Sequence, residues 1–477
     1  MFDHATIFAV ALCLYCISII LGFAFAGKVR SQSEENFLTA GRSIGPLVGG
    51  AALAATQISA GTLVGTVGRH YATGLDWIWI WPGVWFGWLV SAVFIGPKLR
   101  ACGAVTVPDY LSLRFESAFL RVASALVIIF IYIISLTAQY QACGIIFQTV
   151  FGLKPIYGMG ILLIVTAIYT TVGGLRVSSY IDVIQVAIIV GSLAISVVIL
   201  LKYAGGLRAT GDLLTMLDPK LIRGWYGWGQ IISLQVIFAL GIASAPNEMA
   251  RLSSMRDKAT VRYAIGVCFI IQALISVGIL IVGLVIRSIF PYLLSADQAS
   301  PLMSVAILPP LAGSIFLVAL FSAIMSNVNS ILLVSSGSVS HDLYGKFINP
   351  FASEKRKLLC NRLSLVFLSL LPAGLALYGF SDVQSTVLAA ARLVGCFFFV
   401  PVILGLNSRF GSSSGAIAST LGGGMAAIYW ETRNSERFAS IDGAEIGILT
   451  AFGLYILVGN FTPRVSQQTL RRFFGER

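Results

Sequence analysis

The stretch LVALFSAIMSNVNSILLVSSGSVSHDLYG, residues 317–345, decides the fold of this chain. It is long and apolar enough to form a membrane helix, yet polar residues recur along it at spacings of three, four and seven. Such spacings place residues on one face of an α-helix. The face predicted in this way carries Ser322, Ser326, Asn329, Ser330 and Gly337, and Asn327 borders it.

This polar stripe has two interpretations. Polar side chains that face lipid are costly, so the stripe is expected to face the interior of a helix bundle or a wet cavity. Neutral hydroxyl and amide oxygens on one helix face suit a weakly held hard cation. The same residues would also serve as interhelical hydrogen-bond partners, which Ser and Asn often provide in membrane bundles. The stripe alone leaves both interpretations open.

The composition indicates an all-α membrane protein with almost no soluble part. Only 11% of the residues are charged and the mean hydropathy is +0.88, whereas soluble domains carry about 25% charged residues. The net charge of +12 does not indicate a nucleic-acid partner, because the basic residues lie in short loops between apolar runs. We expect a lipid bilayer as partner, no enzymatic activity and no cofactor, since the histidines and cysteines form no catalytic or metal-binding constellation.

Thirteen apolar runs each have roughly the 20 residues that a membrane-spanning helix needs. With the N-terminus outside, 22 lysines and arginines lie in cytoplasmic segments and 9 in external ones. This asymmetry predicts a multi-pass protein of the plasma (cytoplasmic) membrane with its N-terminus outside and its C-terminus inside. The runs are 6–27, 46–69, 77–101, 119–150, 156–175, 181–203, 230–250, 262–290, 303–340, 357–379, 384–408, 411–430 and 442–461.

Two of these runs are interrupted at a matching place. The second contains AATQISAGT (54–62) and the seventh contains GIASAPNE (241–248). Gly and Pro weaken helices, and two broken helices that each begin five spans indicate an inverted-repeat transporter. Two unrelated kinks would give the same pattern. The predicted parts are an N-terminal peripheral helix and loop (1–45), a first repeat (46–203), an external loop (204–229), a second repeat (230–410) and two C-terminal helices with a tail (411–477).

Together, these and other motifs resemble the sodium:solute symporter family, which has the LeuT-type architecture. The resemblance covers roughly residues 35–425 and implies a secondary active transporter that couples sodium influx to uptake of a small organic solute by alternating access. The stretches that carry it are FLTAGRSIG (37–45), AATQISAGTLVG (54–65), VPDYLSLRF (107–115), GGLRVSSYIDVIQ (173–185), SAPNEMARLSS (244–254), SAIMSNVNSILL (322–333) and HDLYG (341–345).

The resemblance implies a sodium site between the first broken helix and the polar stripe. Its ligands would be the backbone carbonyls of Ala55, Ile58 and Ala323 and the side chains of Ser326 and Asn327. Neutral oxygens of this kind can hold Na⁺ without trapping it. Asn327 departs from the Ser or Thr usual in the family, although its side-chain carbonyl can still act as a ligand.

A second sodium site, found in some members of the family, would by the same resemblance use Asp182, Ser326, Asn329 and Ser330. Asp182 has two other interpretations. It is a candidate carboxylate on the path by which sodium leaves, and it is equally a charge at the start of a helix, favoured by the helix dipole.

Solute in this family sits beside the broken helices. Candidates for its binding are therefore Gln57, Ser59 and Thr62 on the second run and Phe238 and Ile242 on the seventh. The fourth run adds Thr137, Gln139, Tyr140 and Gln141, of which Gln139 and Tyr140 equally suit interhelical hydrogen bonds.

Arg392 is a basic residue inside a span. It lies ten residues after Asp382, which is roughly 15 Å along a helix and about half the depth of the hydrocarbon. Because a guanidinium can hold a carboxylate through two hydrogen bonds, we expect an anionic or zwitterionic solute, a carboxylate or an amino acid, bound partly by Arg392. The alternative is a salt bridge between Arg392 and an acid within the membrane.

Three other functions compete with sodium symport. A transporter of the same fold could be coupled to protons, an alternative that the amide side chains of Asn327 and Asn329 suggest. The chain could also serve as a transporter-like sensor. A membrane enzyme is the third. Concentrative uptake separates a transporter from a sensor, and its ion dependence separates sodium from protons.

Overall fold

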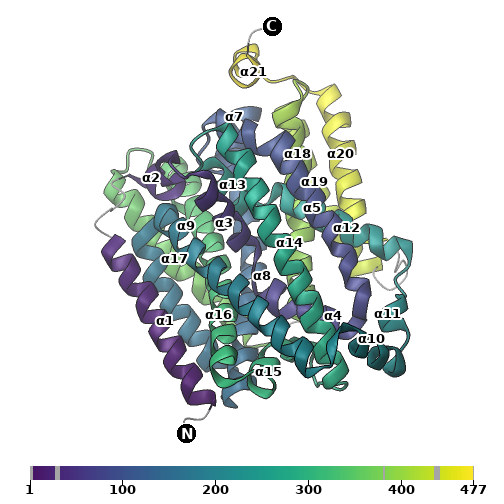
Figure 1. Ribbon diagram of the computed structural model, residues 1–477. Helices are drawn as coiled ribbons and strands as arrows, with labels where there is room; N and C mark the ends of the chain where they lie inside the picture. The colour runs from purple at the N-terminus through teal and green to yellow at the C-terminus, as the bar shows by residue number, and fades with distance from the viewer. Residues whose placement is uncertain (1–3, 27–32, 380–381, 435–440, 476–477) are drawn as a thin grey trace.

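The computed structural model describes residues 4–26, 33–379, 382–434 and 441–475. These residues form a bundle of helices without a β-strand, and only two isolated β-bridges occur among them. Figure 1 shows the described ends of the chain at opposite ends of the bundle.

The α-helices of the first half are α1 (His4–Ala26), α2 (Glu34–Thr39), α3 (Pro46–Gln57), α4 (Val67–Thr73), α5 (Ile80–Val90), α6 (Gly96–Cys102), α7 (Val107–Phe115), α8 (Ala118–Phe151), α9 (Pro155–Tyr203), α10 (Gly206–Leu217) and α11 (Lys220–Arg223). Those of the second half are α12 (Trp228–Ser244), α13 (Pro246–Ser253), α14 (Lys258–Ile289), α15 (Ala299–Ala306), α16 (Pro310–Gly337), α17 (Glu354–Ala376), α18 (Val383–Asn407), α19 (Ser413–Asn434), α20 (Gly443–Phe461) and α21 (Gln467–Phe474). The 3₁₀ helices are η2 (Ala40–Arg42), η4 (Gly74–Trp79) and η6 (Ala296–Gln298), and the π-helices are η3 (Gly61–Thr66), η5 (Ser91–Ile95) and η7 (Ser338–Ile348).

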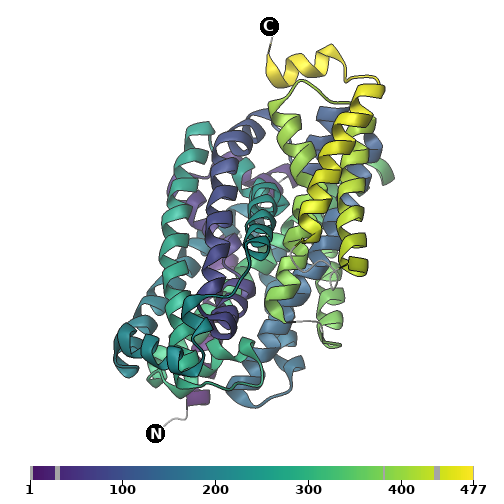
Figure 2. The same cartoon turned by 90° about the vertical axis from the view of Figure 1, so that its right-hand side faces the viewer.

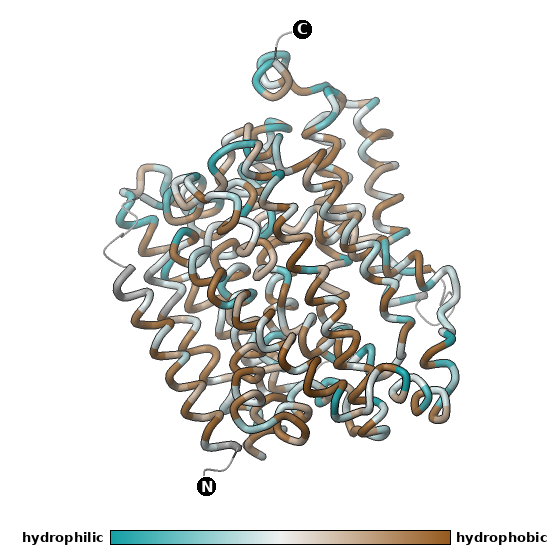
Figure 3. The backbone as a smooth tube through the Cα atoms, viewed as in Figure 1, coloured by the Kyte–Doolittle hydropathy of each residue, from teal (hydrophilic) through white to brown (hydrophobic). Residues whose placement is uncertain are grey.

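Each of the thirteen predicted runs coincides with one or more of these helices. By length and hydropathy alone, eight described helices could cross a membrane, or nine if the bent pair α12–α13 is one span. The fifth and sixth runs are joined in α9, which is continuous except at Gly174, where the backbone has φ 60° and ψ −170°. Residues 176–180, expected as a loop, are therefore helical. Figure 3 shows the apolar residues along the long helices.

Both predicted helix breaks are present. α3 ends at Gln57, and Ile58 adopts an extended conformation before η3 begins. α12 ends at Ser244, Ala245 is extended, and α13 starts directly afterwards at an angle of 40°. Pro246 explains the second break, because a proline disfavours helical conformation in the residue before it and has no N–H to donate.

α16 lies at the centre of the bundle, and almost all of it is buried. It packs against α9, α1, α8, α17 and α3, so residues on all its faces contact protein. The polar stripe therefore faces the interior, as predicted. Figure 2 shows α19 and α20 side by side along one flank, where they also contact α18.

Candidate functional site

The two breaks and the middle of α16 meet at a central cavity. Its volume is about 110 Å³. α3, α8, α12, α16 and α18 supply most of its walls, and Ser59, Ala245 and Asn247, at or beside the breaks, supply the rest. The lining residues are Thr56, Gln57, Ser59, Tyr132, Ser135, Gln139, Phe238, Gly241, Ile242, Ala245, Asn247, Asn327, Ile331, Val387, Ala390, Ala391 and Val394.

The break in α3 frees the two carbonyls that the sequence places in the sodium site. In a continuous helix, Ala55 O would accept from the N–H of Ser59, and Ile58 O from that of Thr62. Instead, Ser59 N donates to Thr62 Oγ1 at 3.3 Å and Thr62 N donates to Ser59 O at 3.0 Å. Both carbonyl oxygens therefore lack their usual donors.

The α16 side of this site carries Ala323, Ser326 and Asn327, all buried. Asn327 Nδ2 donates to Thr56 O at 2.6 Å, which joins α16 to the end of α3. The amide oxygen Asn327 Oδ1 is buried without a hydrogen-bond partner. Ser326 Oγ donates to Asp182 Oδ1 at 2.6 Å, so its lone pairs remain available. Backbone carbonyl, hydroxyl and amide oxygens are the ligands that suit a small hard cation.

The side chains expected to bind a second sodium ion already surround the positively charged guanidinium of Arg251. Arg251 Nη2 lies 2.8 Å from Asp182 Oδ2, and both side chains are at most 2% exposed. The same guanidinium donates to Ser330 Oγ at 2.7 Å. Asn329 Nδ2 donates to Ser178 Oγ, which also accepts from Arg251. The side-chain oxygens expected to bind a second sodium ion are thus committed to Arg251 or lie beside it.

Two expectations about these charged residues are wrong. Arg251 was counted among the loop residues of the cytoplasmic side, but it lies in α13 and is buried in the bundle. Asp182 does not lie at a helix start: it lies inside α9, eight residues after the kink at Gly174, and the dipole effect is confined to the first turn. The helix dipole therefore does not account for Asp182, and the ion pair with Arg251 does.

Most of the expected solute-binding residues meet at the cavity. Gln57, Ser59, Phe238 and Ile242 line it, and so does Gln139, whose Oε1 accepts from Ala60 N at 2.9 Å. Thr62 lines a smaller adjoining cavity of about 60 Å³ that shares Gln57, Ser59 and Phe238. Gln141 does not line it, because it lines a separate cavity with Lys154 and Asp382. Thr137 and Tyr140 do not line the central cavity either.

Arg392 does not line the central cavity, which corrects its predicted role. Its Nε and Nη2 atoms lie 2.6 and 2.5 Å from the two carboxylate oxygens of Asp442, and Nη1 lies 3.3 Å from Glu431. It lines an outer cavity of about 380 Å³ with Arg69, Trp77 and Asp442 among others. The guanidinium is thus paired with protein carboxylates, which is the salt-bridge alternative.

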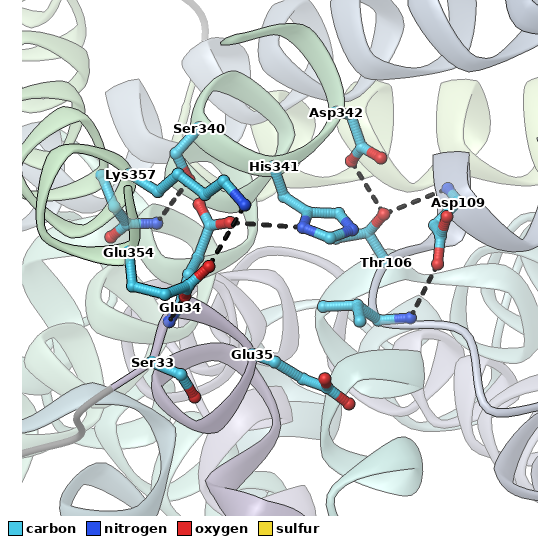
Figure 4. A network of polar contacts seen from close by, with 12 residues as sticks. Ser33, Glu34, Glu35, Thr106, Asp109, Ser340, His341, Asp342, Glu354 and Lys357 are labelled. Atoms are coloured by element: carbon cyan, nitrogen blue, oxygen red, sulfur yellow. Dashed lines mark hydrogen bonds and ion pairs between the residues drawn. The ribbon is translucent and has the colours of Figure 1, made fainter. Parts of the chain in front are cut away.

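A buried polar network ties helices together at the end of the bundle where the chain ends (Figure 4). His341 Nδ1 lies 3.3 Å from Glu34 Oε2, which joins η7 to α2. The neighbouring Asp342 accepts from Thr106 Oγ1 at 2.7 Å and from Arg121 Nη1 at 3.3 Å. These contacts hold η7, α2, α7 and α8 together at the end of the bundle that carries α21.

Sequence reasoning assigned no role to three residues at this site: Glu248, Asn247 and Tyr132. Tyr132 Oη donates to Asn247 Oδ1 and accepts from Asn247 N, each at 2.9 Å. Glu248 is 1% exposed and accepts a hydrogen bond from Gln57. Glu248 could have been singled out, because an acid inside a predicted span is a functional candidate by default. Arg251 directly follows the predicted run 230–250 and gave no such signal.

The fold and the freed carbonyls beside a neutral polar helix are those of an ion-coupled transporter, and the comparisons with known proteins agree. The model of the sodium:solute symporter family matches residues 37–423, so the chain belongs to that family. It is thus a multi-pass membrane transporter that couples sodium to the uptake of a small organic solute.

Three comparisons illustrate the similarity. The chain is 26% identical to the osmoregulated proline transporter OpuE of Bacillus subtilis (strain 168), over 97% of this chain and 96% of that protein. It is 29% identical to the sodium/pantothenate symporter of Escherichia coli (strain K12), over 93% and 94% of the two chains. Among solved structures, a Na⁺-coupled sialic acid symporter in a substrate-bound outward-open state superposes with a TM-score of 0.83 at 16% identity, over 97% and 99% of the two chains.

Proposed function

We propose that one sodium ion binds between the break in α3 and the middle of α16, and that the solute binds beside it in the central cavity. The ligands are the carbonyls of Ala55, Ile58 and Ala323 and the side chains of Ser326 and Asn327. The observation that carries this proposal is the coincidence of two carbonyls without their usual donors and one partnerless buried amide oxygen, Asn327 Oδ1.

The guanidinium of Arg251 takes the place of a second sodium ion beside the side-chain oxygens of Asp182 and Ser330. A sodium ion at Asp182 and Ser330 would have to displace a guanidinium that makes contacts of 2.8 and 2.7 Å with them. A buried carboxylate next to a guanidinium is already compensated, and a second positive charge there would face repulsion. We therefore propose a stoichiometry of one sodium ion in each cycle.

Sodium couples to transport because its ligands come from two elements that can separate. Sodium bound between α3 and α16 favours the arrangement in which the oxygens of the two helices are close together. If sodium increases the affinity for the solute by some factor, thermodynamic linkage requires the solute to increase the affinity for sodium by the same factor. Opening the inner side requires the network around Glu34 and Asp342 to break. Lysines and arginines are more frequent in the loops at this end of the bundle. Because cytoplasmic loops carry such an excess, this end is cytoplasmic and the N-terminus is external.

The solute is a small carboxylate or amino acid. The relatives named above carry proline and pantothenate, and a cavity of about 110 Å³ with many polar walls suits a compact polar molecule. Gln57, Ser59, Phe238 and Ile242 contact it, and Thr62 lies in the adjoining space.

Uptake into proteoliposomes tests this function. An inward sodium gradient at equal internal and external pH should drive accumulation of a radiolabelled solute above its external concentration, with a Hill coefficient for sodium close to one. Accumulation driven only by a proton gradient would instead support proton coupling. Sodium-dependent binding without any accumulation would support a sensor.

A further inference from the structure

Glu248 is a buried acid that neither the sodium site nor the inner network uses. It is the third residue of α13, directly after the break at Ala245. A negative charge is favoured in the first turn of a helix by the helix dipole. Burial of a carboxylate within a membrane protein is costly all the same, and such residues are usually functional.

The contact of Glu248 joins the two broken helices. Gln57, the last residue of α3, donates from Nε2 to Glu248 Oε1 at 2.7 Å. The other carboxylate oxygen, Glu248 Oε2, is buried without a hydrogen-bond partner. One side chain at each break therefore takes part in this bond, and Gln57 is the one of the two that lines the central cavity.

The bond fixes the orientation of the Gln57 amide. Gln57 donates this bond through its NH₂ group, so that group faces Glu248. Its carbonyl oxygen Oε1 then points away from Glu248, and Gln57 is only partly buried, with both the central and the adjoining cavity against it. The cavity wall thus presents an acceptor, with the carboxyl group of Glu248 behind it.

No basic side chain lines the central cavity among the described residues. The charged group nearest to Glu248 on its own helix is Arg251, whose guanidinium is paired with Asp182. The other titratable groups near Glu248 are the hydroxyl of Tyr132 on α8 and the thiol of Cys268 on α14, neither of which can be a cation. With Asp182 and Arg251 compensating each other, no basic side chain among the described residues pairs with the Glu248 carboxyl group.

We propose that Glu248 is a specificity-determining residue that acts through Gln57, and that the solute carries a protonated amine. The amine donates to Gln57 Oε1 and its positive charge lies one side chain away from Glu248. A solute carboxylate would lie toward the sodium ion, because no guanidinium lines the cavity. This inference rests on the proposed function and narrows its substrate class to amine-bearing solutes such as amino acids.

The test compares each amine-bearing solute with its analogue that lacks the amine. Thermal stabilisation of the purified protein in saturating sodium is measured with amino acids that include L-proline, and with their analogues such as cyclopentanecarboxylate, with pantothenate as an amine-free acid. We expect at least one amine-bearing solute to bind ten-fold or more tightly than its analogue. If every amine-free analogue binds as tightly as its amine, or if no amine-bearing solute binds, the proposal is wrong.

Two variants locate the effect. Glu248→Gln keeps the size of the side chain but can donate as well as accept, so the Gln57 amide is no longer fixed. Its KM for the amine-bearing solute should rise about ten-fold with Vmax retained, while the analogue and sodium bind as before. The control is Glu445→Gln, a partly buried acid, which accepts from Ser233 at 2.5 Å outside the central cavity. An equal loss in both variants, or equal losses for amine and analogue, contradicts the proposal. A loss of sodium stabilisation in the unmodified protein would instead refute the proposed sodium site.

Discussion

Asp182 and Arg251 form an ion pair of 2.8 Å in the core of the bundle, although 69 residues separate them in the chain. Asp182 lies in the middle of α9 and Arg251 lies in α13, just after the break in the seventh predicted span. Ser178, Ser179 and Ser330 also accept hydrogen bonds from the guanidinium. The pair therefore joins the broken helix to the two helices that pack most closely at the centre.

Neutralising one member of this pair should destabilise the protein strongly. Asp182→Asn leaves a buried guanidinium without its carboxylate, and loss of one partner of a buried pair costs about 3–5 kcal/mol. Unfolding in detergent with increasing denaturant measures this loss. The control is Asp382→Asn, whose pair with Arg69 at 3.0 Å is partly exposed, so its loss should be about 1 kcal/mol or less. Equal, small effects in the two variants would contradict a buried, compensated pair.

The pairing of Arg392 predicts that this residue does not select the solute. Arg392→Gln removes the contacts with Asp442 and Glu431 and should loosen the packing of α18 against α20, so that the melting temperature falls. Its KM for solute, measured in proteoliposomes, should stay within about two-fold of the unmodified protein. A large and selective rise in KM for carboxylate-bearing solutes would show that Arg392 does bind the solute.

The inner network predicts a conformational effect at Asp342. Asp342→Asn weakens the contacts with Thr106 and Arg121, so the inward-open arrangement should become more populated. Alkylation of a cysteine introduced at Leu333, on α16 beside this network, should then speed up several-fold. Asp257→Asn, at an exposed helix cap, serves as the control. Unchanged alkylation in Asp342→Asn would mean that the network does not close the inner side.

The C-terminal helix α21 should detach in acid. Hydroxyl donation from Ser466 and Thr469 holds the pKa of Glu116 below its ordinary value of 4.5. A group whose pKa is lowered by folding stabilises the folded arrangement above its ordinary pKa, and this contribution is lost as the pH falls through the lowered value. Hydrogen exchange in α21, corrected for the intrinsic rate, should therefore increase as the pH falls below the ordinary value of 4.5 and through the lowered pKa of Glu116. Glu116→Gln should show the faster exchange already at neutral pH, and an acid-insensitive α21 would contradict this.

The sequence was sufficient to predict the elements that local chemistry controls. Pro246 and the glycines near Gln57 mark the two breaks, because their effect on a helix does not depend on the rest of the fold. The polar face of α16 follows from the spacing of Ser322, Ser326 and Ser330. These features position the proposed sodium site, and predicting them required no knowledge of which helices are neighbours.

What could not be predicted depends on contacts between distant segments. Arg392 could not be assigned to Asp442 because the two lie on different helices, 50 residues apart. Gln139 and Gln141 are two residues apart on α8, which turns their side chains by about 200° relative to each other. One therefore faces the central cavity and the other an outer one. Composition alone gives no way to decide which face of α8 contacts α3.

The most direct measurement for the central claim is sodium-dependent thermal stabilisation of three proteins: the unmodified chain, Asn327→Ala and Ser322→Ala. Ser322 lies on the same stripe, but its hydroxyl bonds the carbonyl of Val318 within α16, so it serves as the control. At about 100 times Kd, sodium should stabilise the unmodified protein and Ser322→Ala by about 2.7 kcal/mol, and potassium should not. Asn327→Ala should lose most of this stabilisation. Full sodium stabilisation of Asn327→Ala would contradict a site between the break in α3 and the middle of α16.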